Sequence, residues 1–417
     1  MVSSSDSDNV SATRFLWSFS VAVILLCATL ATINLVIDPY LVAAAPRRAG
    51  INAHKPTAIE NSGLIKAYDV FRVKPRSLVL GSSRVGSGID SSSPWWPEPD
   101  RPVYNLGTPL GDPATAYRYL QNVTARERIS LVVVGIEFQE SETPTNPLLE
   151  EIETHLTVDR NGKPLEDERR IQWRDLLVAT LSFDASADSV TTLFGNLRGN
   201  LSDVNGGFWN ATEYQEWQAR AGAGVFFAEN DLAFSLWYTF KQHNPRPMKD
   251  LRAIVEWCRA RGIRLIFFIN PTHADELEVI DLAGAWTEFE QWKRELVALT
   301  ASSQGGSSGA PVELWDFCDY NSYTTEPVLP GRHRMQWFMD TEHYNQMLGD
   351  RILTRIFGGG AGNFGMLLTP SNLESHLANI REQQRQYRNA RPEQLQRVRS
   401  IYQASVRLRN GFASYPP

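Results

Sequence analysis

The sequence predicts an α/β protein with a mainly parallel sheet that follows one membrane-spanning helix. Short apolar runs, such as residues 131–135, alternate with longer amphipathic segments, and a continuous apolar run is typical of a parallel strand covered on both faces. Residues 15–37 contain no charged side chain. The 417 residues, 42% apolar and 21% charged, provide ample apolar surface for a large core.

Residues 15–37 are long enough to cross a membrane as a helix. At 1.5 Å per residue they span roughly 35 Å, against about 30 Å for the hydrocarbon core of a bilayer. Trp17 and Tyr40 lie near the two ends, where interfacial aromatic residues are common. A cleaved signal peptide has a shorter apolar run and a basic start, whereas Asp6 and Asp8 precede this run. We therefore expect an uncleaved anchor.

The segments that flank the anchor define the expected organisation. Residues 1–14 are rich in Ser and Asp and indicate a disordered tail, and residues 38–70 form a connector. Arg47, Arg48 and Lys55 follow the anchor, and the positive-inside rule alone would place the large domain in the cytoplasm. Large domains translocate largely regardless of charge, so the rule leaves the orientation open.

The predicted α/β domain covers residues 71–357. We expect strands at 77–80, in a short segment that ends at 104–107, and at 131–135, 263–269 and 312–317, and helices at 114–122, 248–261, 288–299 and 340–357. The polar region from about 140 to 235 indicates an irregular insertion that could cap the site. It contains a hairpin signal at Asp159-Arg160-Asn161-Gly162-Lys163.

Residues 361–417 are expected to form a basic helical extension. The region holds many more arginines than carboxylates. Such a helix could lie on anionic lipid or contact a partner, but a solvated helical appendage is the simpler interpretation. The net charge of −6 gives no indication of nucleic acid, whose binders are usually basic.

Two short segments carry the residue types of an activated oxygen nucleophile. Residues 81–84 (Gly-Ser-Ser-Arg) follow the first strand, and Asp340 and His343 lie three residues apart, on what we expect to be one helical face. Ser, His and Asp are the three parts of such a nucleophile. Taken singly, Ser82 and Ser83 could cap a helix, and Asp340 could cap another. Their joint occurrence around one inferred sheet edge favours a catalytic site.

These segments resemble the motifs of the SGNH (GDSL-like) hydrolase superfamily. The shared features are Gly81-Ser82-Ser83-Arg84 followed by Ile89-Asp90, then Tyr104-Asn105-Leu106-Gly107, then Asp340-x-x-His343. More narrowly, residues 15–357 look like membrane-anchored members from bacterial envelopes and exopolysaccharide loci, related to alginate O-acetylation and lipoteichoic-acid D-alanylation proteins. The resemblance implies a three-layer α/β/α domain with a mainly parallel sheet.

The resemblance also implies a role for each matching residue. Ser83, third in the motif, would be the nucleophile, with Ser82 as its rival. His343 would be the general base and Asp340 would orient it. The backbone N–H groups of Ser83 and Gly107 would form the oxyanion hole.

One position departs from the superfamily pattern. The superfamily supplies an Asn side chain from a Gly-x-Asn motif after the third strand, where this sequence has Gly-Ile-Glu at 135–137. An ionised carboxylate cannot donate a hydrogen bond, so Asn105 or Asn270 could substitute. Glu137, Asn270 and His273 are candidates for substrate contact, although each could instead be structural. No residue spacing indicates a metal site, and no cofactor is expected.

Taken together, the resemblance implies a membrane-anchored serine esterase or O-acyltransferase that acts on a cell-surface polysaccharide through an acyl-enzyme. The domain would lie in the periplasm or outside, held by one span in the bacterial cytoplasmic membrane. Its partners would be membrane lipid, the polysaccharide and a membrane-bound acyltransferase, without nucleic acid. The alternative, favoured by the missing Gly-x-Asn motif, is a catalytically inactive binding or scaffold protein of an exopolysaccharide assembly or secretion complex.

Overall fold

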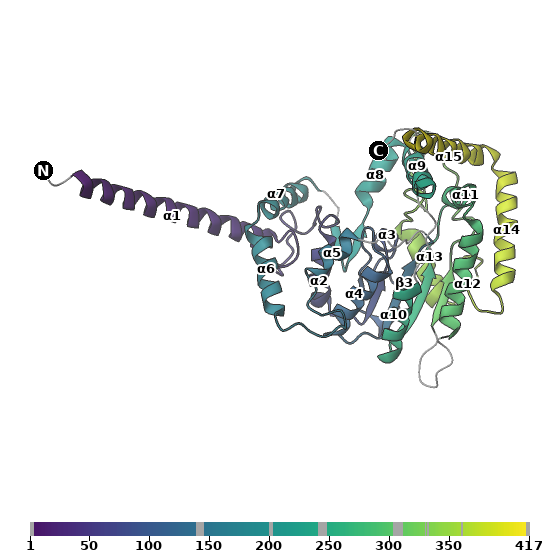
Figure 1. Ribbon diagram of the computed structural model, residues 1–417, viewed down its shortest axis with the longest axis horizontal. Helices are drawn as coiled ribbons and strands as arrows, with labels where there is room; N and C mark the ends of the chain where they lie inside the picture. The colour runs from purple at the N-terminus through teal and green to yellow at the C-terminus, as the bar shows by residue number, and fades with distance from the viewer. Residues whose placement is uncertain are drawn as a thin grey trace.

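The protein is an α/β fold built on a mostly parallel sheet, as the computed structural model shows (Figure 1). The structure describes residues 4–138, 146–199, 203–240, 248–302, 312–329, 331, 333–359 and 362–413. The strands of the main sheet lie in the order β2 (Val103–Asn105), β1 (Ser77–Leu80), β3 (Leu131–Ile136), β6 (Arg264–Ile269), β7 (Glu313–Asp316) and β8 (Met366–Leu367). The first five run parallel, and β8 is antiparallel to β7. A separate hairpin pairs β4 (Asp203–Asn205) with β5 (Phe208–Asn210).

Helices pack on both faces of the sheet. In chain order they are α1 (Ser4–Ile37), α2 (Ser62–Val73), α3 (Ser83–Gly88), the 3₁₀ turn η1 (Glu98–Asp100), α4 (Pro113–Thr124), α5 (Pro147–Glu153), α6 (Glu168–Leu181), α7 (Phe183–Arg198), α8 (Thr212–Ala221), α9 (Ala223–Phe240), α10 (Met248–Ala260), α11 (Ala274–Leu282), α12 (Trp286–Ser302), α13 (Gln346–Phe357), α14 (Leu373–Ala390) and α15 (Pro392–Ala413). Leu78 and Leu80 of β1 join one core with α4, α10 and α12, whereas Val79 joins a second core with α3 and α13. The period of two along each strand divides the side chains between these cores.

Most predicted elements of the α/β domain are confirmed. β1 has the expected bounds, β3 and β6 differ from expectation by one residue at one end, and β7 is one residue shorter at each end. α4, α10 and α12 also lie where amphipathic spacing placed them. These elements depend on local period and apolar content, which the sequence displays directly.

The helix expected at 340–357 is wrong in its first part, because α13 begins only at Gln346. The Oδ1 of Asp340 accepts the N–H groups of Glu342 at 2.8 Å and of His343 at 2.7 Å. The N–H of Met339 donates to the carbonyl of His343 at 2.7 Å. A side chain that binds nearby N–H groups competes with helical hydrogen bonding, so this segment forms a turn.

α1 projects from the domain as a long apolar helix (Figure 1). Within the part of the chain that the structure describes, Ala12–Ile37 is the one helical stretch long and apolar enough to cross a membrane. α1 begins at Ser4, so the expected disordered tail is helical from that residue, while residues 1–3 lie outside the described residues. A helix that has already formed gains one hydrogen bond for each residue it adds, so extension is favourable.

The connector provides hydrogen-bond donors for the C-terminal end of α1, which meets the domain. The last carbonyl groups of a helix have no partner within it, and the buried Lys55 donates from Nζ to the carbonyls of Ile37 at 2.6 Å and Asp38 at 2.9 Å. Burial lowers the pKa of Lys55 to about 8, although the charge of Asp38 opposes this. The connector is also partly helical, because α2 begins at Ser62 and packs against α4 and α5.

The region expected to be an irregular insertion is mostly helical. It contains α5 to α8 and most of α9, with the β4–β5 hairpin between α7 and α8. The hairpin signal at 159–163 is confirmed by a bridge between Val158 and Pro164. α6 and α9 are only weakly amphipathic, so sequence periodicity did not reveal them. Residues 139–145 and 200–202 of this region lie outside the described residues.

The basic C-terminal extension is part of the folded domain, which corrects the expectation of a solvated appendage. α14 packs against α12, and α15 packs against α9 and α11. Leu377, Ile380 and Val398 are buried in the core that covers one face of the sheet. The arginines neutralise carboxylates of the domain, in the pairs Arg381–Glu290, Arg388–Glu278, Arg388–Asp281, Arg397–Asp231 and Arg397–Asp275.

We predict that Arg397→Gln destabilises the whole domain. The change leaves the carboxylates of Asp231 and Asp275, both fully buried, without their counter-charge, and breaking a buried pair in this way costs about 3 kcal/mol. Arg399→Gln, at an exposed position on the same helix, is the control and should change the unfolding free energy by less than about 0.5 kcal/mol. Urea unfolding of the full chain in detergent measures both. Equal stabilities would mean that α15 is an appendage after all.

Candidate active site

A tight turn after β1 presents Ser83. Gly81 has a φ of +145°, and a Cβ there would lie 2.7 Å from a carbonyl oxygen of β3, so only glycine fits. Ser82 caps α3, because its Oγ accepts the N–H of Arg84 at 3.2 Å and donates to the carboxylate of Glu137. The Ser82 hydroxyl is therefore used inside the protein.

Ser83, His343 and Asp340 form a continuous chain of hydrogen bonds. Ser83 Oγ lies 2.8 Å from His343 Nε2, and His343 Nδ1 lies 2.8 Å from Asp340 Oδ2. Because Nδ1 faces a carboxylate, it carries a proton, and the neutral ring then accepts the serine proton at Nε2. The structure thus brings together three residues that the sequence separates by up to 260 positions, in the geometry of an activated serine.

The carboxylate of Asp340 has one partner that the sequence did not indicate. Tyr214 of α8 donates its hydroxyl to Asp340 Oδ2 at 3.0 Å. Oδ1 is occupied by the N–H groups of the turn that contains His343. The tyrosine belongs to no recognisable motif and lies 126 positions from its partner, so only the folded chain reveals it. These donors fix the carboxylate against the imidazole.

The electrostatics of this pair favour a charged imidazole. Burial alone would lower the pKa of His343, but the charge and hydrogen bond of Asp340 raise it to about 9. Burial alone would raise the pKa of Asp340, but the charge of His343 and its hydrogen bonds lower it to about 2. The imidazolium that forms when a serine gives up its proton is therefore stabilised in advance.

The expected oxyanion donors are only partly available. The N–H of Gly107 donates to Asn105 Oδ1 at 2.8 Å. The Asn105 amide nitrogen donates to the carbonyls of Val85 at 2.8 Å and Ile89 at 2.7 Å, so this side chain is structural rather than the donor expected of it. The N–H of Ser83, at the first position of α3, has no acceptor within the helix.

Glu137 occupies the place of the expected asparagine and is bound within the protein. It accepts from Ser82 and from Asn270 Nδ2 at 2.9 Å, and Arg84 Nε lies 3.7 Å away. Asn270 in turn accepts the hydroxyl of Tyr344 at 2.8 Å. Both Glu137 and Asn270 are buried, so they join the ends of β1, β3 and β6 instead of contacting substrate as expected.

His273 is likewise a structural residue, and not the substrate contact considered from the sequence. Its Nδ1 accepts the N–H of Asp275 at 3.2 Å at the start of α11, and its Nε2 donates to the carbonyl of Glu326 at 2.8 Å. The ring is fully buried and lies edge-on to Phe227 and Phe338. A neutral imidazole with its proton on Nε2 satisfies both nitrogens.

Arg84, next to Ser83 in sequence, is buried and paired with carboxylates. Its buried guanidinium donates to Thr272 Oγ1 at 3.0 Å and to both carboxylate oxygens of Glu276, at 3.1 and 3.2 Å. Burial raises the pKa of Glu276 to about 8, although the charge of Arg84 acts in the opposite direction. Burial similarly raises the pKa of Glu342, which is adjacent to His343 in sequence.

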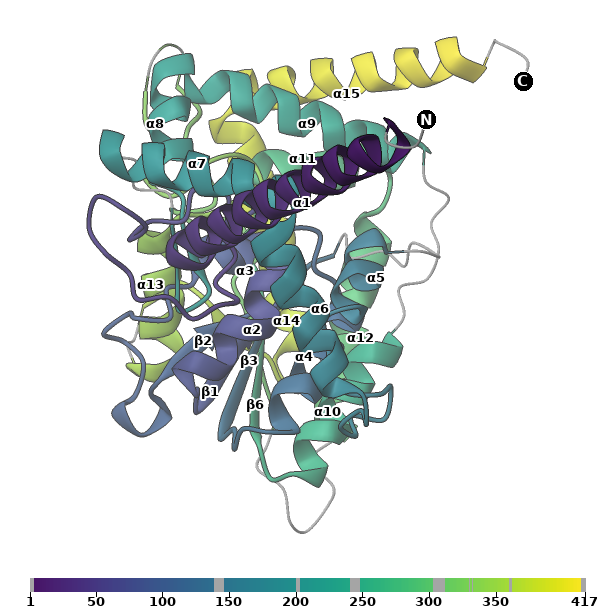
Figure 2. The ribbon, with the colours of Figure 1, turned by 90° about the vertical axis from the view of Figure 1, so that its left-hand side faces the viewer.

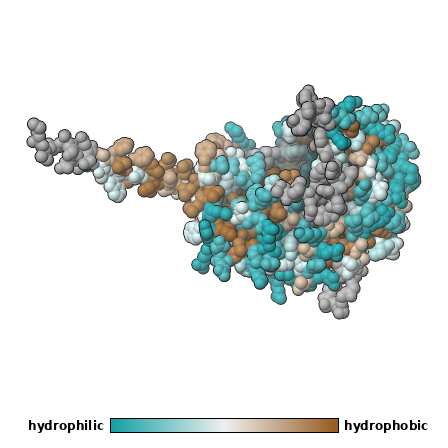
Figure 3. Space-filling view, in the orientation of Figure 1, coloured by the Kyte–Doolittle hydropathy of each residue, from teal (hydrophilic) through white to brown (hydrophobic). Residues whose placement is uncertain are grey.

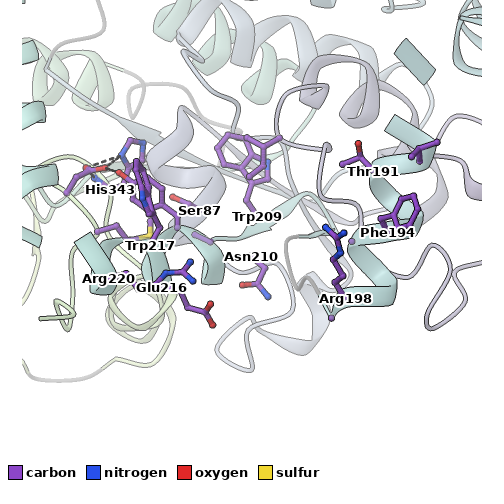
Figure 4. Close-up of a pocket in the computed structure, with 18 residues that line it drawn as sticks. Ser87, Thr191, Phe194, Arg198, Trp209, Asn210, Glu216, Trp217, Arg220 and His343 are labelled. Carbon is purple, nitrogen blue, oxygen red and sulfur yellow. Dashed lines mark hydrogen bonds and ion pairs between the residues drawn. The ribbon is translucent and has the colours of Figure 1, made fainter. Parts of the chain in front are cut away.

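His343 and Asp340, but not Ser83, line a cavity of about 1120 Å³. Its lining extends from His343 past Trp209 and Trp217 to α7 (Figure 4). Trp209 belongs to β5 and Trp217 to α8, so the 140–235 region contributes to the lining of the cavity. This volume slightly exceeds the range of about 300–1,000 Å³ that is usual for small-molecule sites.

Comparisons with known proteins add no family assignment. No protein-family model matches the chain, and no curated protein matches it significantly. Among the residues that the structure describes, no cluster of His, Cys, Asp or Glu side chains is arranged to hold a metal ion. The resemblance to SGNH hydrolases therefore rests on the short motifs quoted above.

We predict that Asp340→Asn lowers the pKa of His343 from about 9 to below its ordinary value of 6.5. Without the carboxylate charge, burial is the main remaining influence, and burial disfavours the imidazolium. Histidine-selective NMR titration of the full chain in detergent measures this, and a His343→Gln spectrum assigns the resonance among the seven histidines. An unchanged titration midpoint would show that Asp340 does not control this imidazole.

Proposed function

We propose that this protein is a serine esterase or O-acyltransferase of the SGNH hydrolase superfamily, with the three-layer α/β/α domain typical of that superfamily. One observation carries the proposal: the unbroken hydrogen-bond chain from Ser83 through His343 to Asp340, of which His343 and Asp340 line a large cavity. The mostly parallel sheet supports it, because Ser83 begins α3 only three residues after the end of β1. Open α/β sheets carry their sites at the carboxyl ends of their strands.

The first half of the reaction makes an acyl-enzyme. Ser83 Oγ forms a bond to the carbonyl carbon of an ester, the carbonyl electron pair moves to oxygen, and the serine proton moves to His343 Nε2. The carbonyl bond then reforms and the bond to the alcohol oxygen breaks. The departing alcohol takes the proton from Nε2, so the ester oxygen leaves as a neutral hydroxyl.

The second half returns the serine. Water or a sugar hydroxyl attacks the acyl carbon and gives its proton to His343 Nε2, and that proton returns to Oγ as the bond to Ser83 breaks. With water the product is a carboxylic acid, and with a sugar hydroxyl it is a new ester. The two outcomes differ only in which nucleophile reaches the acyl carbon.

The negative oxygen of each tetrahedral intermediate requires hydrogen-bond donors. We assign the N–H of Ser83 to this role, at the N-terminus of α3 where the helix dipole favours negative charge. The N–H of Gly107 becomes a second donor once it exchanges Asn105 Oδ1 for the substrate oxygen. A single missing donor of this kind lowers turnover by about 10²–10³-fold, so this exchange has a large effect on rate.

The substrate class follows from the resemblance and is consistent with the cavity. Exposed Trp217 and buried Trp209 present aromatic surface, which suits stacking on sugar rings, while Asn210 and Glu216 add polar groups. In this proposal the domain lies outside the cytoplasm, anchored by α1 in the bacterial cytoplasmic membrane. The polymer is a cell-surface polysaccharide, and a membrane-bound acyltransferase supplies the acyl group if the protein is a transferase.

We predict that a serine-directed fluorophosphonate labels Ser83. Labelling and hydrolysis of a chromogenic acetyl ester should both disappear in Ser83→Ala and in His343→Ala, because neither variant can form the activated oxygen. Ser82→Ala is the matched control, since its hydroxyl is bonded to Glu137, and it should retain labelling. Labelling that depends on Ser82, or ester hydrolysis that persists in Ser83→Ala, would contradict the assignment.

The raised pKa of His343 predicts an alkaline activity profile. The imidazole accepts the serine proton only when it is neutral, and with a pKa of about 9 the neutral fraction grows with pH up to that value. We therefore expect kcat/KM for ester hydrolysis to rise about tenfold per pH unit between pH 6 and 8 and to level off above pH 9. If kcat/KM is constant from pH 6 to 8, the pKa that controls activity is not a His343 pKa of about 9.

A second function, polysaccharide binding without turnover, has one observation in its favour. The place of the third oxyanion donor holds Glu137, and the N–H of Gly107 is already bonded to Asn105. A binding protein would retain polysaccharide affinity in Ser83→Ala and would show no fluorophosphonate labelling at Ser83. Covalent labelling of Ser83 would exclude this reading.

A further inference from the structure

α6 and α7 turn apolar side chains outward instead of into the core. These side chains are about half exposed or more, and Phe183 is 86% exposed. We call this surface the α6–α7 face, and its residues are Trp173, Leu177, Val178 and Leu181 of α6 and Phe183, Val190, Phe194 and Leu197 of α7. An apolar surface of this extent marks an interaction site, because soluble proteins rarely leave one exposed.

The outward orientation follows a regular helical pattern. On α7, Phe183, Val190, Phe194 and Leu197 recur at spacings of seven, four and three residues, which places them on one side of the helix. The opposite side of α7 contributes the buried Ala185 to the core. The exposed side is therefore the apolar face of an amphipathic helix, and it has no protein partner among the described residues.

The α6–α7 face is continuous with the apolar helix α1. Asn34 of α1 donates to the carbonyl of Thr180 at 2.9 Å and to the Ser186 hydroxyl at 3.0 Å, at the junction of α6 and α7. Tyr40 donates to Asp188 at 2.8 Å. Figures 1 and 2 place α6 and α7 at the end of the domain from which α1 projects, and the hydrophobic colouring of α1 continues onto that end in Figure 3.

We infer that the α6–α7 face lies in the headgroup region of the bilayer that α1 crosses. The uncharged residues 15–37 span roughly 35 Å, about 5 Å more than the hydrocarbon core of a bilayer. Amphipathic helices at a membrane surface insert their apolar faces by about 5–10 Å. The roughly 5 Å by which the uncharged part of α1 exceeds the hydrocarbon core thus matches a depth of insertion. It is the depth to which the domain end of α1, together with α6 and α7, would enter the interface.

This placement specifies where the substrate comes from, and so it rests on the proposed function. Val190 and Phe194 belong to the α6–α7 face and also line the cavity whose other end holds His343. Figure 4 shows Phe194 and Thr191 at the end of the lining opposite to His343. The cavity therefore opens at the bilayer surface along α7. Where the protein acts as a transferase, the ester from which Ser83 takes its acyl group is one carried by a lipid in that bilayer, and this lipid replaces the membrane-bound acyltransferase as the immediate donor.

The depth of the α6–α7 face in the membrane is measured on the full chain in vesicles of phosphatidylethanolamine and phosphatidylglycerol. Nitroxide labels are attached in the separate variants Leu177→Cys, Phe183→Cys and Leu408→Cys, in a chain that carries Cys27→Ala and whose other cysteines are buried. Leu408 is the matched control, because it is an exposed apolar residue of α15. Figure 1 shows α15 away from the end of α1 that meets the domain. For each nitroxide label, two effects on its relaxation rate are compared. One is the effect of oxygen, which concentrates in lipid, and the other is the effect of a nickel chelate, which stays in water.

Labels at 177 and 183 are expected to be relaxed mainly by oxygen, at a depth of about 5–10 Å, and the label at 408 mainly by the nickel chelate. Labels at 177 and 183 that are as accessible to nickel as the label at 408 would overturn the inference. This measurement needs no turnover, so its result does not depend on the proposed function.

The substrate is tested with two esters of the same leaving group. In the double variant Leu177→Glu, Phe183→Glu, we expect hydrolysis of p-nitrophenyl palmitate in the same vesicles to fall about tenfold, because charged side chains are unfavourable in the interface. Hydrolysis of dissolved p-nitrophenyl acetate should change less than about twofold, since neither residue lines the cavity. Leu408→Glu should leave both rates unchanged.

The outcomes separate the two proposals. If the double variant hydrolyses both esters equally more slowly, or neither more slowly, the inference that Ser83 takes its acyl group from a bilayer lipid is overturned. The proposed esterase activity is not affected by that result. A parent chain that hydrolyses neither ester would overturn the proposed function. In that case the depth measurement still decides whether the α6–α7 face contacts lipid.

Discussion

The buried guanidinium of Arg84 is the interaction on which the site depends. It lies between Thr272 and Glu276, which follow β6, and Glu137, which follows β3, and it is adjacent in sequence to the nucleophile candidate Ser83. Without this positive charge, several carboxylates would lie buried and unpaired, a situation that costs several kcal/mol. The requirement to neutralise them holds the α3 turn against the sheet and so determines where the serine hydroxyl points.

The same principle recurs away from the site, where buried charges are neutralised by residues distant in sequence. Asp316 at the end of β7 pairs with Lys293 of α12 at 2.6 Å and with His376 of α14 at 2.9 Å, and all three are buried. At the other end of the molecule, Lys55 satisfies the last carbonyls of α1. These contacts attach the C-terminal helices and the end of the domain that meets α1 to one sheet, so both are integral parts of the domain.

The site is assembled from elements that play different roles. The sheet and α3 position the serine, a turn before α13 positions the imidazole and its carboxylate, and α8 adds the Tyr214 hydroxyl. The cavity beside them is lined largely by β5, α7 and α8. Since α7 also packs against α1, the region that would bind substrate is connected directly to the apolar helix.

Sequence patterns predicted the central fold well because strands such as β1 and β3 are short, apolar and bounded by turn residues. They failed at α6 and α9, whose apolar residues do not form one strong stripe. They also extended the last helix of the domain back to Asp340, because the carboxylate that caps the turn is not distinguishable in sequence from one that caps a helix.

The sequence by itself determined the apolar helix, the strands of the central sheet with the helices between them, and the candidates Ser83, His343 and Asp340, because these depend on composition, local period and short motifs. Only the tertiary structure decided that Ser83 and not Ser82 bonds to His343, that Asn105 is satisfied internally, and that the α6–α7 face points outward. The physical reason is that each of these outcomes depends on which distant group comes within hydrogen-bonding or packing distance, and the linear chain does not specify that.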